Sequence, residues 1–159
     1  MADRIALKRI AHVYYKHKDL AASRQFMHDF GFEETATHGE QIFFRGYGSE
    51  PFVVAIEPGE SDEFGGAAFA VESADELDKA VRLLPPEAKA TPVHDIEGAP
   101  GGGKRVTFWD PVDGFPFHLV YGQTEVAVRD PKFPVLKVNY VSWCDAAATA
   151  VACVRVCSG

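Results

Sequence analysis

Residues 107–122 read TFWDPVDGFPFHLVYG and predict a strand, a turn and a returning strand. Asp113-Gly114 lies between two apolar runs, and this dipeptide is a strong hairpin signal. Side chains alternate along a strand, so the returning strand presents Phe117, Leu119 and Tyr121 on one face and His118 and Val120 on the other. An ionisable group inside an apolar strand makes His118 a candidate site residue. The plainer interpretation is a histidine satisfied by a hydrogen bond.

The hairpin is the end of a pattern that occurs twice: strand, helix, strand, strand, strand. The first set is expected at residues 4–15, 19–29, 32–37, 41–45 and 52–56. The second set is expected at residues 65–71, 73–84, 90–94, 104–109 and 117–121. A constant shift superposes the apolar stripes of the two helices, since it places Phe26 on Ala80 and Phe30 on Leu84. The same shift places His12 on Gly66.

Two such units side by side predict one α+β domain in which a curved sheet forms a cup and the helices cover its outer face. Alternation assigns large apolar side chains to the outer face: Val13, Phe52, Val54, Ile56, Phe69, Val71, Phe117, Leu119 and Tyr121. It assigns a smaller set to the inner face: Ile10, His12, Tyr14, Val53, Ala55, Gly66, Ala68, Ala70, His118 and Val120. Because the inner set lacks bulk, a cavity is expected inside the cup.

Composition bounds the class of protein. A chain of 159 residues with 47% hydrophobic residues can build one domain with a real core. The net charge of −7 disfavours nucleic acid and anionic membrane surfaces as partners. No run approaches membrane-spanning length and the first residues do not resemble a secretory signal, so a cytoplasmic protein is expected. The three cysteines, all in the last part of the chain, suggest neither a disulfide framework nor a zinc site.

With these features the chain resembles the vicinal oxygen chelate superfamily of glyoxalases, bleomycin-resistance proteins and type I extradiol dioxygenases. The resemblance covers about residues 5–125. It is carried by residues 7–20 (LKRIAHVYYKHKDL), 54–62 (VAIEPGESD) with 67–71 (AAFAV), and 109–122 (WDPVDGFPFHLVYG). The likeness is greatest to the N-terminal domain of two-domain extradiol dioxygenases that cleave catechols, which implies an oxidoreductase of aromatic catabolism.

The resemblance also implies where a metal would bind. Family members take ligands from positions that correspond here to His12, Val53, Gly66 and His118, and extradiol enzymes hold Fe(II) with two histidines and a carboxylate. In this chain His12 matches, Gly66 replaces the second histidine and His118 replaces the carboxylate. His12 and His118 are therefore an incomplete metal site that Tyr14 or a nearby acid would have to complete. Fe(II) is implied by the family but is not expected to bind to this chain alone.

The positions around these two histidines are expected to line a ligand cavity. They are Ile10, Tyr14, Val53, Gly66, Ala68 and Val120.

The domain organisation follows from the extent of the resemblance. Residues 1–125 are expected to form the vicinal oxygen chelate domain, with modules at about 5–57 and 65–122. Residues 126–140 correspond to an interdomain connector, and residues 141–159 form an atypical tail rich in Ala and Val. The tail suggests a truncated or mis-joined end where a catalytic domain would follow, and a genuine short strand or helix is the alternative.

Three functions remain open. The first is a chain that keeps only the non-catalytic domain of an extradiol dioxygenase. The second is a glyoxalase-type enzyme whose metal site is completed across a homodimer or homo-oligomer. The third is a metal-free protein that sequesters a small aromatic ligand in the cup. A glyoxalase would need carboxylates at Val53 and His118, and the chain has neither.

Overall fold

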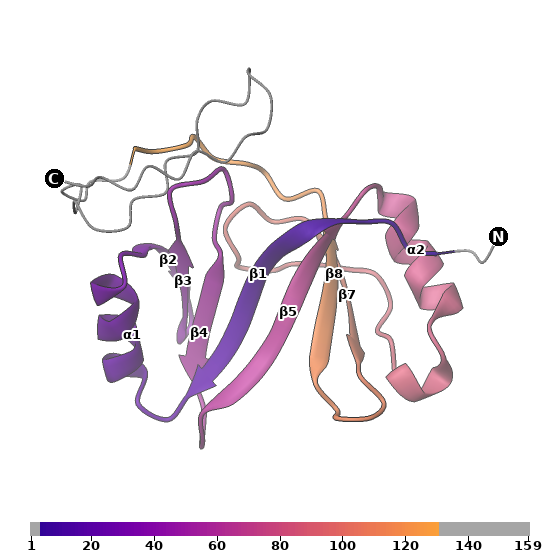
Figure 1. Cartoon of the computed structure of the whole chain (residues 1–159), viewed down its shortest axis with the longest axis horizontal. Coiled ribbons are helices and arrows are strands. Elements are labelled where there is room, and N and C mark those ends of the chain that lie inside the picture. Colours follow the sequence, from indigo (N-terminus) through magenta and orange to yellow (C-terminus); the bar gives the residue numbers. More distant parts are fainter. Residues whose placement is uncertain (1–3, 131–159) are drawn as a thin grey trace, which may run out of the picture. The chain divides into compact units, whose positions relative to one another are not determined.

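The computed structural model describes residues 4–130, which contain one mixed eight-stranded sheet in the order β2-β3-β4-β1-β5-β8-β7-β6 and two α-helices (Figure 1). The first elements are β1 (Leu7–His17), α1 (Leu20–Asp29), β2 (Glu33–His38), β3 (Gln41–Arg45) and β4 (Val54–Pro58). The next are β5 (Glu63–Val71), α2 (Ala74–Leu83), the 3₁₀-helix η1 (Pro86–Ala88), β6 (His94–Asp95), β7 (Lys104–Trp109) and β8 (Pro116–Tyr121).

The sheet consists of two equivalent units that meet at β1 and β5. In each unit the first strand pairs in parallel with the last one, so β1 pairs with β4 and β5 with β8. The two first strands pair antiparallel with each other at the centre of the sheet. This arrangement confirms the predicted α+β fold built from two strand–helix–strand–strand–strand units.

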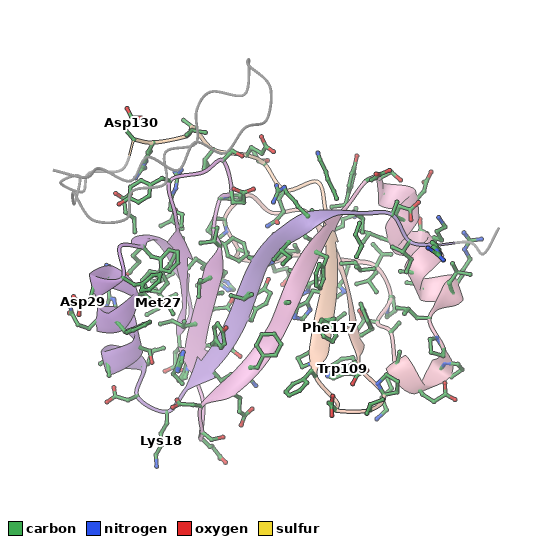
Figure 2. The ribbon with its side chains drawn as sticks, in the orientation of Figure 1. Lys18, Met27, Asp29, Trp109, Phe117 and Asp130 are labelled. Atoms are coloured by element: carbon green, nitrogen blue, oxygen red, sulfur yellow. The ribbon has the colours of Figure 1, made fainter. Side chains whose placement is uncertain are left out.

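The helices cover one face of the sheet, one helix for each unit (Figure 1). Asp19 caps α1 by accepting a hydrogen bond from the backbone N–H of Ala22 at 2.9 Å. Met27 of α1 packs against strand residues of the first unit, and Figure 2 shows it directed toward the strands while Asp29 points away. Leu77 and Ala80 of α2 pack against the second unit in the same way. The amphipathic stripes seen in the sequence therefore bury against the sheet.

The opposite face of the sheet, here called the concave face, carries its own cluster. Its members are Ala11, Tyr14, Phe43, Phe52, Ala55, Ala68, Ile96 and Val120. Most of the predicted inner positions that are small or aromatic belong to it, as alternation along the strands requires.

Ile10 is an exception, and its predicted position on the concave face is wrong. A bulge in β1 places Ile10 opposite Phe69 and His12 opposite Ala68, so Ala11 is an extra residue of β1 without a partner in β5. The bulge reverses the alternation before Ala11. Ile10 consequently lies on the helix side of the sheet and is 66% exposed.

Phe52 and Val53 also exchange faces relative to the prediction. Phe52 belongs to the concave cluster, whereas Val53 packs against the cluster under α1. The physical reason is that β4 begins only at Val54. The two preceding residues lie in irregular backbone, where the alternation of a strand does not apply. The strand predicted at residues 90–94 is likewise shorter, and only His94–Asp95 pairs with β7.

Beyond β8, residues 122–130 return along the first unit. The buried guanidinium of Arg45 donates to the carbonyl oxygens of Gly46, Gly48 and Ala127. Arg129 forms an ion pair with Glu33. The predicted tail at 141–159 and most of the predicted connector lie outside the described residues. Within 4–130, neither helix combines the length and apolar character that crossing a bilayer would require.

The packing of α2 gives a first prediction. Leu77 is fully buried, whereas Leu83 on the same helix is 45% exposed. Leu77→Ala is expected to lower the free energy of unfolding by about 2–5 kcal/mol, and Leu83→Ala by less than about 1 kcal/mol. Urea denaturation followed by circular dichroism measures both. Equal losses would show that α2 does not pack on the sheet through Leu77.

Candidate functional site

The candidate site lies on the concave face, where three neighbouring strands place their side chains in one row. His12 of β1 is in register with Ala68 of β5, which is in register with His118 of β8. The two imidazoles thus extend from strands that are separated by one strand, with the small side chain of Ala68 between them. Tyr14 lies in edge contact with both rings, 5.1 Å from His12 and 5.0 Å from His118 between ring centres.

His12 is a buried, neutral imidazole. Its Nε2 shares a hydrogen bond of 3.0 Å with the hydroxyl of Tyr14, and its ring lies 4.1 Å from that of Phe52. Its Nδ1 is buried without a hydrogen-bond partner among the described residues. Burial, together with smaller effects of the nearby His118 and Arg105, lowers the pKa of His12 to about 3. Burial also raises the pKa of the Tyr14 hydroxyl, so both groups are uncharged at neutral pH.

His118 has partners for both ring nitrogens. Its Nε2 donates to the carbonyl oxygen of Gly65 at 3.2 Å. Its Nδ1 accepts from the hydroxyl of Thr107, the residue opposite it on β7, at 2.9 Å. Burial lowers the pKa of His118 to about 4 against the opposing effect of the Gly65 hydrogen bond. The imidazole therefore has no lone pair left for a metal ion in this arrangement.

Gly66 is conformationally constrained by the same histidine. Its φ of +119° is a backbone conformation that residues with a side chain rarely adopt. A Cβ at this position would lie 2.5 Å from Nε2 of His118 and 2.7 Å from the carbonyl oxygen of Pro116. The space that a side chain at position 66 would need is thus filled by the His118 ring.

The structure brings most of the predicted site residues together. Tyr14, Ala68 and Val120 belong to the concave cluster, beside His12, His118 and Gly66. Ile10 and Val53 do not contribute, for the reasons given above.

Arg105 and Thr107 of β7 are functional candidates that the sequence prediction did not name. Arg105 lies opposite Val120 on the concave face, with its guanidinium carbon 5.8 Å from the centre of the Tyr14 ring. Its Nε donates to Nε2 of His94 at 3.4 Å. The hairpin pairing of β7 with β8 was the available signal, because it places Thr107 opposite His118 and Arg105 opposite Val120.

Two neighbouring cavities on this face share His94 and Arg105 in their walls. The larger measures about 810 Å³. Its walls include Phe64, Gly65, Thr91, His94, Arg105, Thr107, Trp109, Phe115 and His118. The second measures about 520 Å³ and includes Tyr14, Gln41 and Ile96. Both are large enough for a small organic ligand.

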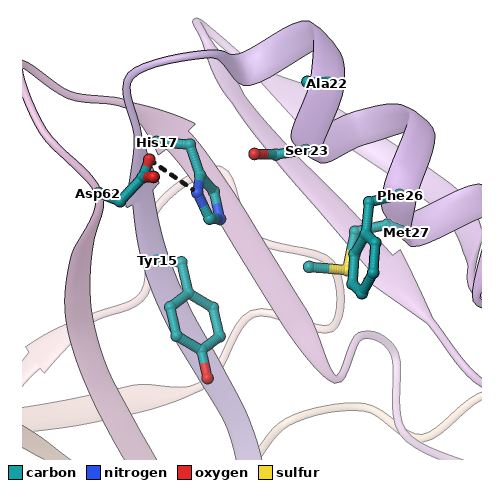
Figure 3. A pocket seen from close by; sticks show the side chains of 7 residues that line it. All are labelled: Tyr15, His17, Ala22, Ser23, Phe26, Met27 and Asp62. Atoms are coloured by element: carbon teal, nitrogen blue, oxygen red, sulfur yellow. Dashed lines mark hydrogen bonds and ion pairs between the residues drawn. The ribbon is translucent and has the colours of Figure 1, made fainter.

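A further pocket of about 490 Å³ lies on the helix side of the sheet, between α1 and β1 (Figure 3). Phe26 and Met27 of α1 and Tyr15 of β1 line it, and Nδ1 of His17 bonds to Asp62 at 3.3 Å. None of the predicted site residues reaches this pocket. The concave face of residues 4–130 remains the candidate site because its cavities include residues that the sequence singled out, Tyr14 and His118.

The residues present do not fit an Fe(II) ion. Of the four positions that the family uses, Val53 faces away, Gly66 offers no donor and His118 has both nitrogens bonded. His12 alone cannot hold the metal, and a facial site requires two imidazoles and a carboxylate. Within residues 4–130, no group of three or more His, Cys, Asp or Glu side chains is placed to bind a metal ion.

Comparison with solved structures places this geometry in a known fold. A Mn(II)-bound glyoxalase from Novosphingobium aromaticivorans superposes with a TM-score of 0.67 and 26% sequence identity. Homoprotocatechuate 2,3-dioxygenase from Arthrobacter globiformis gives 0.66 and 23%, as does an extradiol ring-cleaving dioxygenase from B. fuscum. Each match covers 80% of this chain. The chain has the vicinal oxygen chelate fold.

The chain spans less than half the length of each of these vicinal oxygen chelate proteins. The chain covers 43% of the glyoxalase, 40% of the Arthrobacter enzyme and 36% of the B. fuscum enzyme. No protein-family model matches the sequence, and no curated protein matches it either. The comparison therefore establishes the vicinal oxygen chelate fold and leaves activity to be argued from the site.

The fit of His118 against Gly66 gives a second prediction. Gly66→Ala is expected to lower the free energy of unfolding by several kcal/mol, because the added Cβ meets His118 and backbone. Gly39→Ala is the matched control, since Gly39 also has a positive φ but a Cβ there meets nothing within 4 Å. It should cost only about 1 kcal/mol. Thermal denaturation of both variants compares them, and equal losses would contradict the close approach.

The neutral imidazoles predict acid sensitivity. His12 and His118 have folded pKa values of about 3 and about 4, below their ordinary value of 6.5. The unfolded chain therefore binds more protons between these limits, and stability is complete above pH 6.5 and falls as the pH is lowered toward 4. Lowering the pH from 6.5 to 5 should reduce the free energy of unfolding by roughly 2 kcal/mol for each of the two imidazoles.

Urea unfolding at both pH values tests this expectation. His12→Gln should lose less stability on acidification than the parent chain. His38→Gln, at an exposed histidine, should behave like the parent. If His12→Gln shows the same loss as the parent, the imidazole of His12 is not buried in the neutral form.

Proposed function

We propose that this vicinal oxygen chelate domain is metal-free and non-catalytic, and that it corresponds to the non-catalytic N-terminal half of an extradiol ring-cleavage dioxygenase of catechols. The observation that carries the proposal is the bonding of His118. Gly65 and Thr107 occupy both nitrogens of the ring, and the ring fills the place of a donor at Gly66. His118 therefore stabilises the packing of β5, β7 and β8 through its hydrogen bonds and has no nitrogen free to bind iron.

The share of two dioxygenases that the chain matches also supports this proposal. The chain matches 36–40% of two ring-cleaving dioxygenases, a share that one of two similar halves would cover. In such a role the domain contributes a scaffold, and ring cleavage is either absent or supplied by a partner chain. The proposed class is thus a structural domain of aromatic catabolism in the cytoplasm.

Metal-free binding of a small aromatic ligand is the second candidate. The cavity of about 810 Å³ favours it, since a purely structural domain needs no such space. The walls provide aromatic surface from Trp109 and Phe115 and polar groups from Thr107 and Arg105. A glyoxalase-type enzyme completed by dimerisation would need carboxylates at positions 53 and 118, where the chain has Val53 and His118.

Metal analysis combined with an activity assay tests the proposal. The purified chain is treated with chelator, incubated anaerobically with Fe(II), desalted and analysed for iron. It is then mixed with catechol and 3,4-dihydroxyphenylacetate under air. We expect far less than one iron per chain and no yellow ring-fission product, because the side chains that would bind the metal directly are missing.

His12→Ala and His118→Ala are the matched variants. The small amount of iron that binds should be the same in both variants as in the parent chain. Stoichiometric iron with catechol turnover, lost in both variants, would overturn the proposal and make the domain an enzyme.

A further inference from the structure

We propose that the concave face binds an aromatic carboxylate, with Arg105 as the group that recognises the anion. The proposal rests on the second candidate function, metal-free ligand binding, and specifies its ligand class. It does not depend on whether the domain also serves a dioxygenase as a scaffold.

Arg105 is a half-buried cation that has no carboxylate partner. It is the second residue of β7, lies on the concave face and lines both cavities there. Among residues 4–130, no Asp or Glu side chain lies within ion-pair distance of its guanidinium, whereas Lys104 next to it pairs with Asp95 at 2.9 Å. A half-buried guanidinium is usually paired with an anion, so one with no such partner beside a cavity is available for a ligand.

The contacts that Arg105 does make orient it without neutralising it. Nδ1 of His94 donates to the carbonyl oxygen of Pro92 at 3.0 Å, which leaves Nε2 to accept from Nε of Arg105 at 3.4 Å. The ring of Tyr14 lies beneath the guanidinium carbon. The guanidinium is thereby fixed in position and keeps its positive charge.

The remaining walls of the larger cavity suit an aromatic ring. Trp109, Phe64 and Phe115 line the same cavity, and the rings of Phe64 and Phe115 meet at 5.9 Å between centres. His118 lies in the wall as a neutral group, because its nitrogens are bonded and its pKa is low. An aromatic ring against these side chains would place a carboxylate substituent within the cavity that Arg105 lines.

The net charge of the chain does not attract an anion to this face, so its recognition depends on Arg105. Three carboxylates line the larger cavity (Asp62, Glu63 and Asp113) and two line the second cavity (Asp95 and Glu97). All five residues are exposed, so solvent screens their charges. The chain has a net charge of −7, which repels anions in general. An anion that binds despite this charge must therefore be held by a specific cation, and Arg105 is the cation on the concave face that is fixed in place and lacks a carboxylate partner among the described residues.

The test uses two probes of nearly the same shape, 2-naphthoate and 2-naphthamide, with chelator-treated protein in isothermal titration calorimetry. We expect 2-naphthoate to bind about tenfold tighter, because a hydrogen bond between two charged groups is stronger than one from the guanidinium to a neutral amide. Arg105→Gln should remove this preference, so that the variant binds the two probes with similar affinity. Arg105→Lys should retain part of the preference.

Lys104→Gln is the matched control, because it removes a neighbouring exposed charge of β7 that lies outside both cavities. It should bind both probes like the parent chain. The proposal is overturned if the parent binds both probes equally or neither of them, or if Arg105→Gln and Lys104→Gln have the same effect. The comparison of the two probes on the parent chain decides the matter even if an Arg105 variant fails to fold. Iron content and catechol turnover do not enter this result.

Discussion

The antiparallel pairing of β1 with β5 is the constraint on which the rest of the structure depends. It joins the two units at the centre of the sheet, and its register places His12 opposite Ala68 and Tyr14 opposite Gly66. The bulge before His12 sets which side chains of β1 reach the concave face. The parallel pairing of β5 with β8 then aligns His118 with Ala68. The site is therefore assembled by strand pairing rather than by loops.

Strand pairing places the polar side chains of His12, Tyr14 and His118 on the concave face, but these groups do not form a metal site. Burial keeps His12 and His118 neutral, and Tyr14 contacts both rings, so the two imidazoles act as packing groups joined through an aromatic side chain. The charge on this face comes from Arg105 instead. A fold shared with a glyoxalase and with dioxygenases thus carries here a different set of chemical groups, which is why activity cannot be transferred with the fold.

The sequence predicted the architecture well because the signals for it are local and repeated. The Asp-Gly turn fixed the β7–β8 hairpin, and the two amphipathic helices revealed the repeat. The errors arose where a strand departs from simple alternation. Ile10 precedes a bulge and Val53 precedes the start of β4, and neither departure has a mark in the sequence. Arg105 and Thr107 could have been found from the hairpin register, whereas the bonding of His118 to Gly65 joins residues that are distant in the sequence and required coordinates.

The tight fit of His118 over Gly66 has a consequence for how this domain could change. A donor introduced at position 66 alone would collide with the imidazole, and a carboxylate introduced at position 118 alone would leave the glycine without a donor and remove the partner of Thr107. Neither step by itself approaches a metal site. The two positions therefore constrain each other, and a route to iron binding by single substitutions passes through less stable intermediates. In evolutionary terms positions 66 and 118 are epistatic, because the effect of a substitution at one depends on the residue at the other.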